Sequence, residues 1–198
     1  MGYTTHFYGA VDITPPLNEH EISYLEDFNQ TIHRTYADDR PLAVYPAGTP
    51  RTGLPEVTNH FLAPAPKPGI HCGWTVSEDG SELVTAGDSD HDYDHPEWLA
   101  FLIEHLFDPT NPDALIHRHR GDDPRLKHFT AHTFRGVLAA DGEGDDDDWY
   151  IFVGDRNTSY TAPGLEVGIM TVEDLVEAAS PQLKTSVTRA VTTGTTND

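Results

Sequence analysis

The sequence has almost no cysteine and no long apolar run. Cys72 is the only cysteine among 198 residues, so an intrachain disulfide is excluded and a cysteine-based zinc site is disfavoured. No apolar stretch approaches the roughly 20 residues that a membrane-spanning helix needs, and the N-terminus lacks the basic and apolar succession of a secretory signal. We therefore expect a cytoplasmic protein without a membrane partner.

Positive charge is also scarce. The chain has 33 acidic residues against 12 Lys and Arg, and its formal net charge is −21 at pH 7. Such a surface repels the phosphates of nucleic acids and anionic lipids, so we expect no direct nucleic-acid partner. Two interpretations of the acidity remain open. The carboxylates could be a halophilic adaptation that keeps the protein hydrated, or they could imitate a polyanion and dock on a basic groove of another protein.

Enough hydrophobic residues remain for a folded core, since they make up 37% of the chain. At this length the core fits one domain, which we place at 1–191, with a flexible tail at 192–198. Within the domain, 36–68 carries seven prolines and is predicted to be a long loop. Residues 108–127 form a polar insert rich in His and Arg, predicted as a loop with a short helical turn. Further helical stretches are predicted over 171–191.

Alternating apolar residues predict the strands. Side chains that repeat every second position are typical of a strand with one buried face. A hairpin is expected between Ile70 and Val84, with its turn at 78–81, and a short strand is expected at 159–161. The longer alternations occur in three segments, 3–13, 129–140 and 149–153.

Apolar residues three or four positions apart predict the helices. One begins after Asn18, which with Glu21 matches a capping box. A core helix is expected from Trp98 to Phe107, with Asp94 or His95 as its cap. The order of elements predicts an α+β fold: an antiparallel sheet of hairpins and a meander, with two to four helices packed mainly on one face.

Several short motifs of the chain occur together in a known family. The motifs are Met1-Gly2-Tyr3-Thr4-Thr5-x-Phe7-x-Gly9, Tyr24-Leu25-x-x-Phe28-Asn29, Cys72-Gly73-Trp74, Glu97-Trp98-Leu99 and Phe134-x-Gly136-Val137-Leu138. With them the sequence resembles a family of small uncharacterised proteins of bacteria and their phages. The resemblance implies a fold and a phage or mobile-element setting, and it implies no chemistry. The sequence departs from the family pattern before the core helix, where Ala86-Gly87-Asp88-Ser89-Asp90-His91 replaces a Trp-Asp-Gly-x-Glu-Lys turn.

One candidate site is an acidic loop before the core helix. Asp88, Asp90, Asp92 and Asp94 alternate along it, so their oxygens could converge on Ca²⁺ or Mg²⁺. The loop departs from a calcium-binding loop, because it lacks a glycine at the sixth position and has Leu99 at the twelfth. A solvated acidic loop is therefore the alternative.

A second candidate is the acidic run Asp145, Asp146, Asp147 and Asp148. It lies between two predicted strands and is expected at a hairpin tip, where it would contact the basic surface of a protein partner. The alternative is a solvated tip without a binding role.

Two histidine pairs have spacings that zinc ligands use. His117 and His119 would share a face of a strand, and His128 and His132 would share a face of a helix. The arginines around His119 oppose a cation, and 129–140 is predicted as a strand, so zinc binding is disfavoured.

No catalytic residues are assigned. The chain lacks a nucleophile elbow and a phosphate-binding glycine loop, and Cys72 is expected to be a buried core residue. We expect a non-catalytic acidic binding or accessory protein, of phage or mobile-element origin, that docks on a basic protein partner as an inhibitor or polyanion mimic. The alternative is a small metal-dependent enzyme or a nucleotide-handling protein that uses the Asp88–Asp94 loop. The basic cluster at 117–127 has no assigned role.

Overall fold

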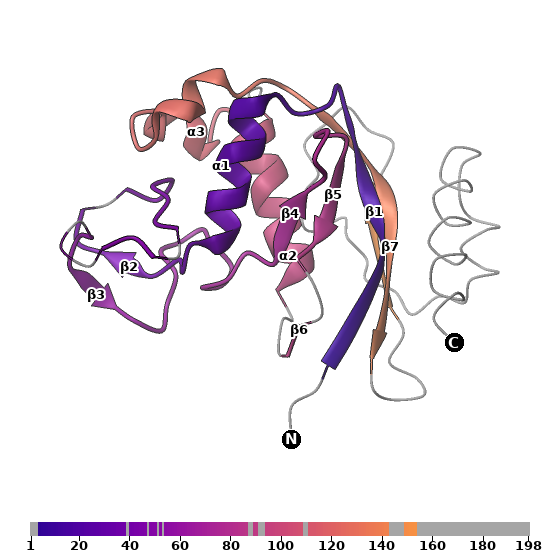
Figure 1. Cartoon of the computed structure of the whole chain (residues 1–198), viewed down its shortest axis with the longest axis horizontal. Coiled ribbons are helices and arrows are strands. Elements are labelled where there is room, and N and C mark those ends of the chain that lie inside the picture. The colour runs from indigo at the N-terminus through magenta and orange to yellow at the C-terminus, as the bar shows by residue number, and fades with distance from the viewer. Residues whose placement is uncertain are drawn as a thin grey trace.

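An antiparallel sheet organises the chain. The computed structural model describes residues 4–38, 40–46, 48–50, 52, 54–86, 89–90, 94–108, 111–142 and 149–153. The spatial strand order is β4-β5-β1-β7-β8, and a short strand, β6, also pairs with β1 (Figure 1). The strands are β1 (Thr4–Thr14), β4 (Trp74–Val76), β5 (Glu82–Thr85), β6 (Ser89–Asp90), β7 (Thr133–Gly142) and β8 (Trp149–Val153).

The pairing of β1 with β7 forms the centre of the sheet. It runs without interruption from Thr5 opposite Gly142 to Thr14 opposite Thr133. Gly136 allows the close approach of the two strands, because a Cβ there would overlap the carbonyl oxygen of Ala10. The strands expected at 3–13, 129–140 and 149–153 are found as β1, β7 and β8, and the expected hairpin is found as β4 and β5. β7 begins at Thr133 rather than at residue 129, because the N–H of Thr130 bonds to Glu21 of α1 instead.

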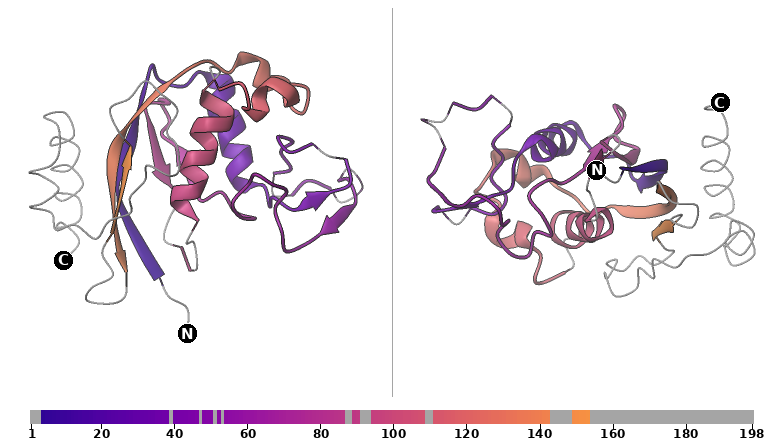
Figure 2. Two further views of the ribbon diagram at one scale, coloured as in Figure 1. Left: turned by 180° about the vertical axis from the view of Figure 1, so that it is seen from behind. Right: turned by 90° about the horizontal axis from the view of Figure 1, so that it is seen from below.

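The described helices lie on one face of this sheet, so the predicted α+β class is confirmed (Figures 1 and 2). The core between the two layers contains Tyr24 and Phe28 from the first helix, Trp98 and Leu102 from the second, and Val11 from the sheet. The helices are α1 (Glu19–Gln30), α2 (His95–Leu102) with a π-helical continuation η2 (Ile103–Phe107), α3 (Leu115–His119) and the 3-10 helix η3 (Pro124–His128).

The two predicted helix starts differ in their chemistry. The Asn18 side chain accepts hydrogen bonds from the main chain of His20 and Glu21, and the Glu21 carboxylate accepts one from the Asn18 N–H, so the capping box is confirmed. Asp94 occupies the cap position of α2, but its side chain makes no capping hydrogen bond. Pro96 in the first turn lacks the N–H that such a bond would satisfy.

Two stretches expected to be loops are more ordered than the sequence suggested. Within 36–68, β3 (Val57–Asn59) pairs with β2 (Thr35–Tyr36) in a small separate sheet, which projects beyond α1 on the side away from the large sheet (Figure 1). Both α3 and η3 lie in the predicted polar insert. The predictions for 143–148, 159–161, 171–191 and 192–198 lie outside the described residues. None of the described helices is long and apolar enough to cross a membrane.

A buried ion pair joins α1 to the entry of β7. The side chains of Glu21 and His132 are 0% and 1% exposed, and His132 Nε2 lies 3.0 Å from Glu21 Oε1. The other ring nitrogen, Nδ1, lies 2.7 Å from the carbonyl oxygen of Pro15. Because carbonyl and carboxylate oxygens only accept hydrogen bonds, this geometry fits an imidazolium that donates from both nitrogens.

The same carboxylate accepts two main-chain hydrogen bonds. The N–H of Asn18 donates to Glu21 Oε2 at 2.8 Å, and the N–H of Thr130 donates to Oε1 at 2.8 Å. Burial raises the pKa of Glu21, but the hydrogen bonds from His132, Asn18 and Thr130 outweigh it together. The pKa of Glu21 therefore lies below its ordinary value of 4.5.

We expect Glu21→Ala to lower the free energy of unfolding by about 3–5 kcal/mol, because it leaves a buried cation without its partner. A carboxylate with a lowered pKa stabilises the fold above its unfolded-state pKa and loses this effect as the pH falls through the folded-state pKa. The difference between the two proteins in urea unfolding should therefore shrink below about pH 4.

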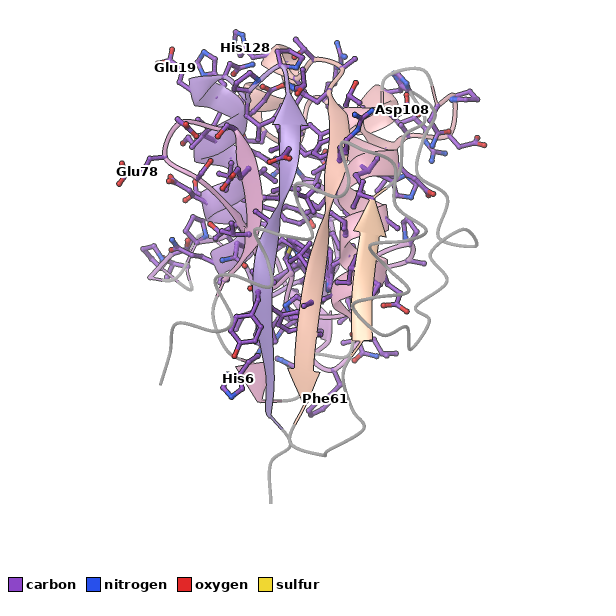
Figure 3. The ribbon with its side chains drawn as sticks, turned by 90° about the vertical axis from the view of Figure 1, so that its right-hand side faces the viewer. His6, Glu19, Phe61, Glu78, Asp108 and His128 are labelled. Atoms are coloured by element: carbon purple, nitrogen blue, oxygen red, sulfur yellow. The ribbon has the colours of Figure 1, made fainter. Side chains whose placement is uncertain are left out.

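Glu19→Ala is the matched control for this experiment. Glu19 lies in the same first turn, points away from the domain and is 89% exposed (Figure 3). It should lose no more than about 1 kcal/mol, the usual contribution of a charge at a helix end. Equal unfolding midpoints for the two variants would contradict the importance of the ion pair.

Candidate functional site: a basic pocket

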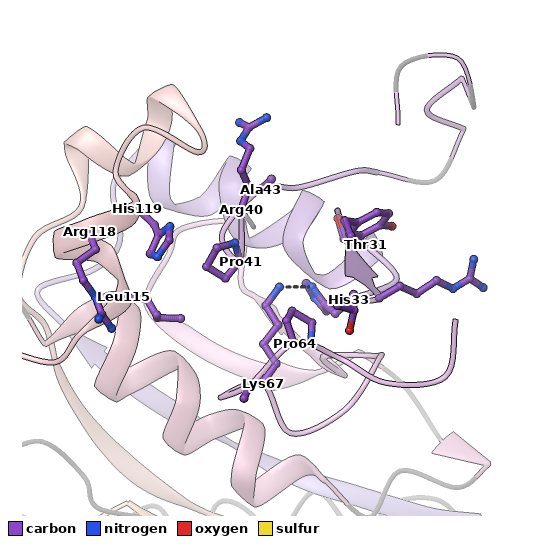
Figure 4. Close-up of a pocket in the computed structure, with 14 residues that line it drawn as sticks. Thr31, His33, Arg40, Pro41, Ala43, Pro64, Lys67, Leu115, Arg118 and His119 are labelled. Carbon is purple, nitrogen blue, oxygen red and sulfur yellow. Dashed lines mark hydrogen bonds between the residues drawn. The ribbon is translucent and has the colours of Figure 1, made fainter. Parts of the chain in front are cut away.

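A pocket of about 180 Å³ lies between the end of α1, the loop that follows β3, and α3 (Figure 4). Four segments that are distant in sequence form its wall. The lining residues are Thr31, His33, Arg34, Thr35, Tyr36, Arg40, Pro41, Ala43, Pro64, Ala65, Lys67, Leu115, Arg118 and His119.

The lining of this pocket is strongly basic. Arg34, Arg40, Lys67 and Arg118 are four of only 12 Lys and Arg in the chain, whereas none of the acidic residues that the structure describes belongs to the lining. The positive charge of an acidic protein is therefore concentrated in one concave place, which favours anions locally.

The end of α1 shapes one wall. Thr31 caps the helix, and its hydroxyl both donates to the carbonyl of Asp27 at 2.8 Å and accepts from the N–H of Tyr45 at 2.8 Å. The chain then runs on in extended form, and the N–H of His33 donates to the carbonyl of Ile70 at 2.8 Å. These bonds fix His33 and its neighbours beneath the C-terminal end of α1.

Asp122 joins the segment around Leu42 to the turn after α3. Its carboxylate accepts the N–H of Leu42 at 3.0 Å and lies 3.5 Å from His119 Nδ1. Arg40 donates to the main-chain carbonyl of Asp122 and lies 3.9 Å from its carboxylate. Asp122 therefore offsets part of the charge of Arg40 and holds the rim of the pocket together.

Inside the pocket, Lys67 and His33 form a buried pair. Lys67 is 8% exposed and His33 is 1% exposed, and their atoms Nζ and Nδ1 are 2.9 Å apart, as the dashed line in Figure 4 marks. His33 Nε2 lies 3.0 Å from the carbonyl oxygen of Phe28 and must donate to it. Nδ1 is then the acceptor, and the lysine amine donates to it.

Burial shifts the pKa values of both partners downward. Desolvation lowers the pKa of His33 well below 6.5, and the positive charge of Lys67 lowers it further. Desolvation also lowers the pKa of Lys67 to about 7, although Cys72 and Asp122 oppose the shift. The pocket therefore holds a neutral imidazole beside an amine that is only partly protonated near neutral pH.

Two arginines are available to a ligand. Atom Nε of Arg34 is buried and has no hydrogen-bond partner. In the part of the chain that the structure describes, no carboxylate lies within ion-pair distance of Arg34, Lys67 or Arg118. A guanidinium presents a planar set of donors that matches a carboxylate or a phosphate, so the buried, unsatisfied Nε of Arg34 points to an anionic ligand.

The acidic sites predicted from the sequence are placed only in part. The backbone of Asp90 lies in β6, and Asp94 is exposed at the start of α2. Asp88 and Asp92 lie outside the described residues, and so do all members of the acidic run Asp145–Asp148. Within the described ranges, no group of three or more His, Cys, Asp and Glu side chains could hold a metal ion.

Three histidines of the two candidate zinc-binding pairs contact other protein groups. His132 is bonded to Glu21, and His128 stacks on His20 with ring centroids 4.0 Å apart. His119 is directed to Asp122. Cys72 is 1% exposed in the core, as expected.

Sequence reasoning missed the pocket, although it noted the basic cluster at 117–127. That cluster supplies Arg118 and His119, whereas Arg34, Arg40 and Lys67 come from stretches that show no local motif. The available signal was the scarcity of lysine: Lys67 is one of three in the chain and lies among prolines.

Comparisons with protein-family models, with curated proteins and with solved structures found no match. The function is therefore inferred from the chemistry of the pocket itself.

Proposed function

We propose that this protein binds a small anion, carrying a carboxylate or phosphate group, in the basic pocket. The observation that carries the proposal is the composition of the lining, which includes four of the 12 Lys and Arg and, among the described residues, no Asp or Glu. A protein with so many carboxylates could neutralise these cations internally. Instead, Nε of Arg34 is buried without a hydrogen-bond partner, and Arg118 makes no ion pair with a carboxylate in the described part of the chain.

The size and charge of the molecule restrict the ligand class. The pocket of about 180 Å³ is smaller than the roughly 300–1,000 Å³ of sites for drug-sized ligands. The net charge of −21 repels long polyanions, whereas a short anion can enter a local positive field. The lone, buried thiol of Cys72 is compatible with a reducing compartment, so a cytoplasmic location belongs to this proposal.

A polyvalent anion should raise the melting temperature beyond the effect of ionic strength. A ligand that binds only the folded state at 100 times its Kd stabilises it by about 2.7 kcal/mol, or roughly 5–10 °C for a chain of this length. We would compare phosphate and citrate with potassium chloride at equal ionic strength by thermal denaturation. Equal shifts in all three salts would contradict a specific site and indicate only screening of the acidic surface.

Arg118→Gln should remove most of the anion-specific shift, because Arg118 lines the pocket. Arg120→Gln is the matched control, since it changes the charge equally at an exposed neighbour outside the lining. An anion-specific shift that survives Arg118→Gln and is lost in Arg120→Gln would place the site elsewhere.

A second candidate function is docking on a basic protein partner, and the net charge of −21 favours it. In this proposal the acidic protein acts as an accessory factor or inhibitor, in a phage or mobile-element setting, and the run Asp145–Asp148 makes the contact. Association through such charge is fast and sensitive to salt.

Replacing Asp145, Asp146, Asp147 and Asp148 with Asn should weaken this salt-sensitive binding without lowering stability. The partner is first identified by capture at low salt. Its rate of dissociation is then measured for each variant and compared. A control variant, with the same change of charge, replaces four exposed glutamates elsewhere with Gln: Glu19, Glu26, Glu78 and Glu97. If both variants bind equally, only the net charge matters and the acidic run is not a contact site.

A further inference from the structure

Lys67 has a chemical environment that anion binding alone does not require. Its side chain is 8% exposed but still lines the pocket, and its amine lies 5.2 Å from the centre of the Phe28 ring. Lysine is seldom buried this deeply without a paired carboxylate. Perturbed titratable groups in a pocket are typical of reactive sites.

His33 orients the amine for reaction. Its Nε2 donates to the carbonyl of Phe28, so its Nδ1 can only accept, and the amine uses one N–H for this bond. The lone pair of the neutral amine then remains free for an electrophile. With a pKa of about 7, Lys67 is neutral in a large share of the molecules at physiological pH.

We propose that the pocket is a reactive site in which the amine of Lys67 forms an imine with the carbonyl carbon of a small oxo acid. The inference rests on the proposed function, because the ligand that reaches Lys67 is an anion and the lining of the pocket supplies Arg34, Arg40 and Arg118. In Figure 4 the amine of Lys67 is directed to His33 in the interior of the pocket. The volume of about 180 Å³ restricts the ligand to a short chain.

The reaction is a balanced condensation. The nitrogen lone pair attacks the carbonyl carbon, a C–N bond forms, and the electron pair of the C=O bond moves to oxygen. Atom Nδ1 of His33, which lies 2.9 Å from the amine, accepts the proton that the nitrogen loses and gives it to this oxygen. The second N–H proton passes the same way to the resulting hydroxyl group, which leaves as water when the C=N bond forms.

The charges around Lys67 determine how the reaction depends on pH. The groups that face it are His33 after α1, Cys72 before β4, Asp122 after α3, and the arginines and His119 of the lining. Burial outweighs the two groups that favour the ammonium form, so the pKa is about 7. The rate of imine formation should therefore increase as the pH rises through about 7, as the amine loses its proton.

Reductive trapping tests the proposal on the full chain. The protein is incubated with glyoxylate and cyanoborohydride at pH 7, and the modified lysines are identified by peptide mass spectrometry. Lys127, which is exposed, serves as an internal control in the same sample. We expect modification at Lys67 to be at least roughly tenfold faster than at Lys127, because the neutral fraction of a lysine amine increases as its pKa falls.

Glycolaldehyde is the matched neutral probe, since it has an aldehyde and nearly the same size but no carboxylate. It should modify Lys67 more slowly than glyoxylate does. Phosphate should slow the reaction of Lys67 with glyoxylate but not the reaction with glycolaldehyde. Lys67→Arg, which keeps a cation but cannot form an imine, should abolish the modified peptide. Arg118→Gln should slow the glyoxylate reaction, whereas Arg120→Gln should not. The comparison of Lys67 with Lys127 in the wild-type protein tests imine formation even if the Lys67→Arg variant does not fold.

The outcomes separate the two proposals. If phosphate and citrate stabilise the protein specifically but Lys67 reacts no faster than Lys127, imine formation is wrong and anion binding stands. If glyoxylate and glycolaldehyde modify Lys67 equally and no anion stabilises the fold, the anionic ligand is wrong, and with it both proposals. Preferential modification of Lys67 by glyoxylate, suppressed by phosphate, supports both.

Discussion

The ion pair between Glu21 and His132 is the constraint on which the arrangement of the layers depends. It joins the first turn of α1 to the residue that precedes β7, and β7 pairs along the whole length of β1. Thr130 lies in the segment 129–140 that the sequence predicts as a strand, but its N–H donates a hydrogen bond to this same carboxylate. An ion pair of this kind is costly to desolvate and costly to break, so its value lies in fixing one orientation of the helix on the sheet.

The pocket depends on that orientation. Once the N-terminal end of α1 is fixed, its C-terminal end places Phe28 and Thr31 over the segment that carries His33. At the other side, Arg125 of η3 donates to Asp27 of α1 at 2.7 Å, which holds η3 against α1. The wall that supplies Arg118 and His119 is thereby kept close to the wall that supplies Lys67.

The sequence predicted the interactions between residues that are close along the chain and missed those between distant residues. The capping box of Asn18 and the strand alternation of β1 are local, and both were predicted correctly. The bond from Glu21 to His132 joins residues 111 positions apart, and no periodicity reports such a pair. The pocket is similar, because only the tertiary fold brings Arg34 and Arg118 to the lining of the same pocket. The basic cluster at 117–127 was visible in the sequence, but its partners across the pocket were not.

The acidity of the chain and the basic pocket have one electrostatic explanation. A surface with a net charge of −21 keeps other polyanions away. In the pocket, Asp122 is already engaged by Leu42, Arg40 and His119, and Lys67 is too deeply buried to reach a carboxylate from the surface. The pocket therefore keeps a buried cation that is unpaired within the described part of the chain, and a small, mobile anion is a species that can reach it.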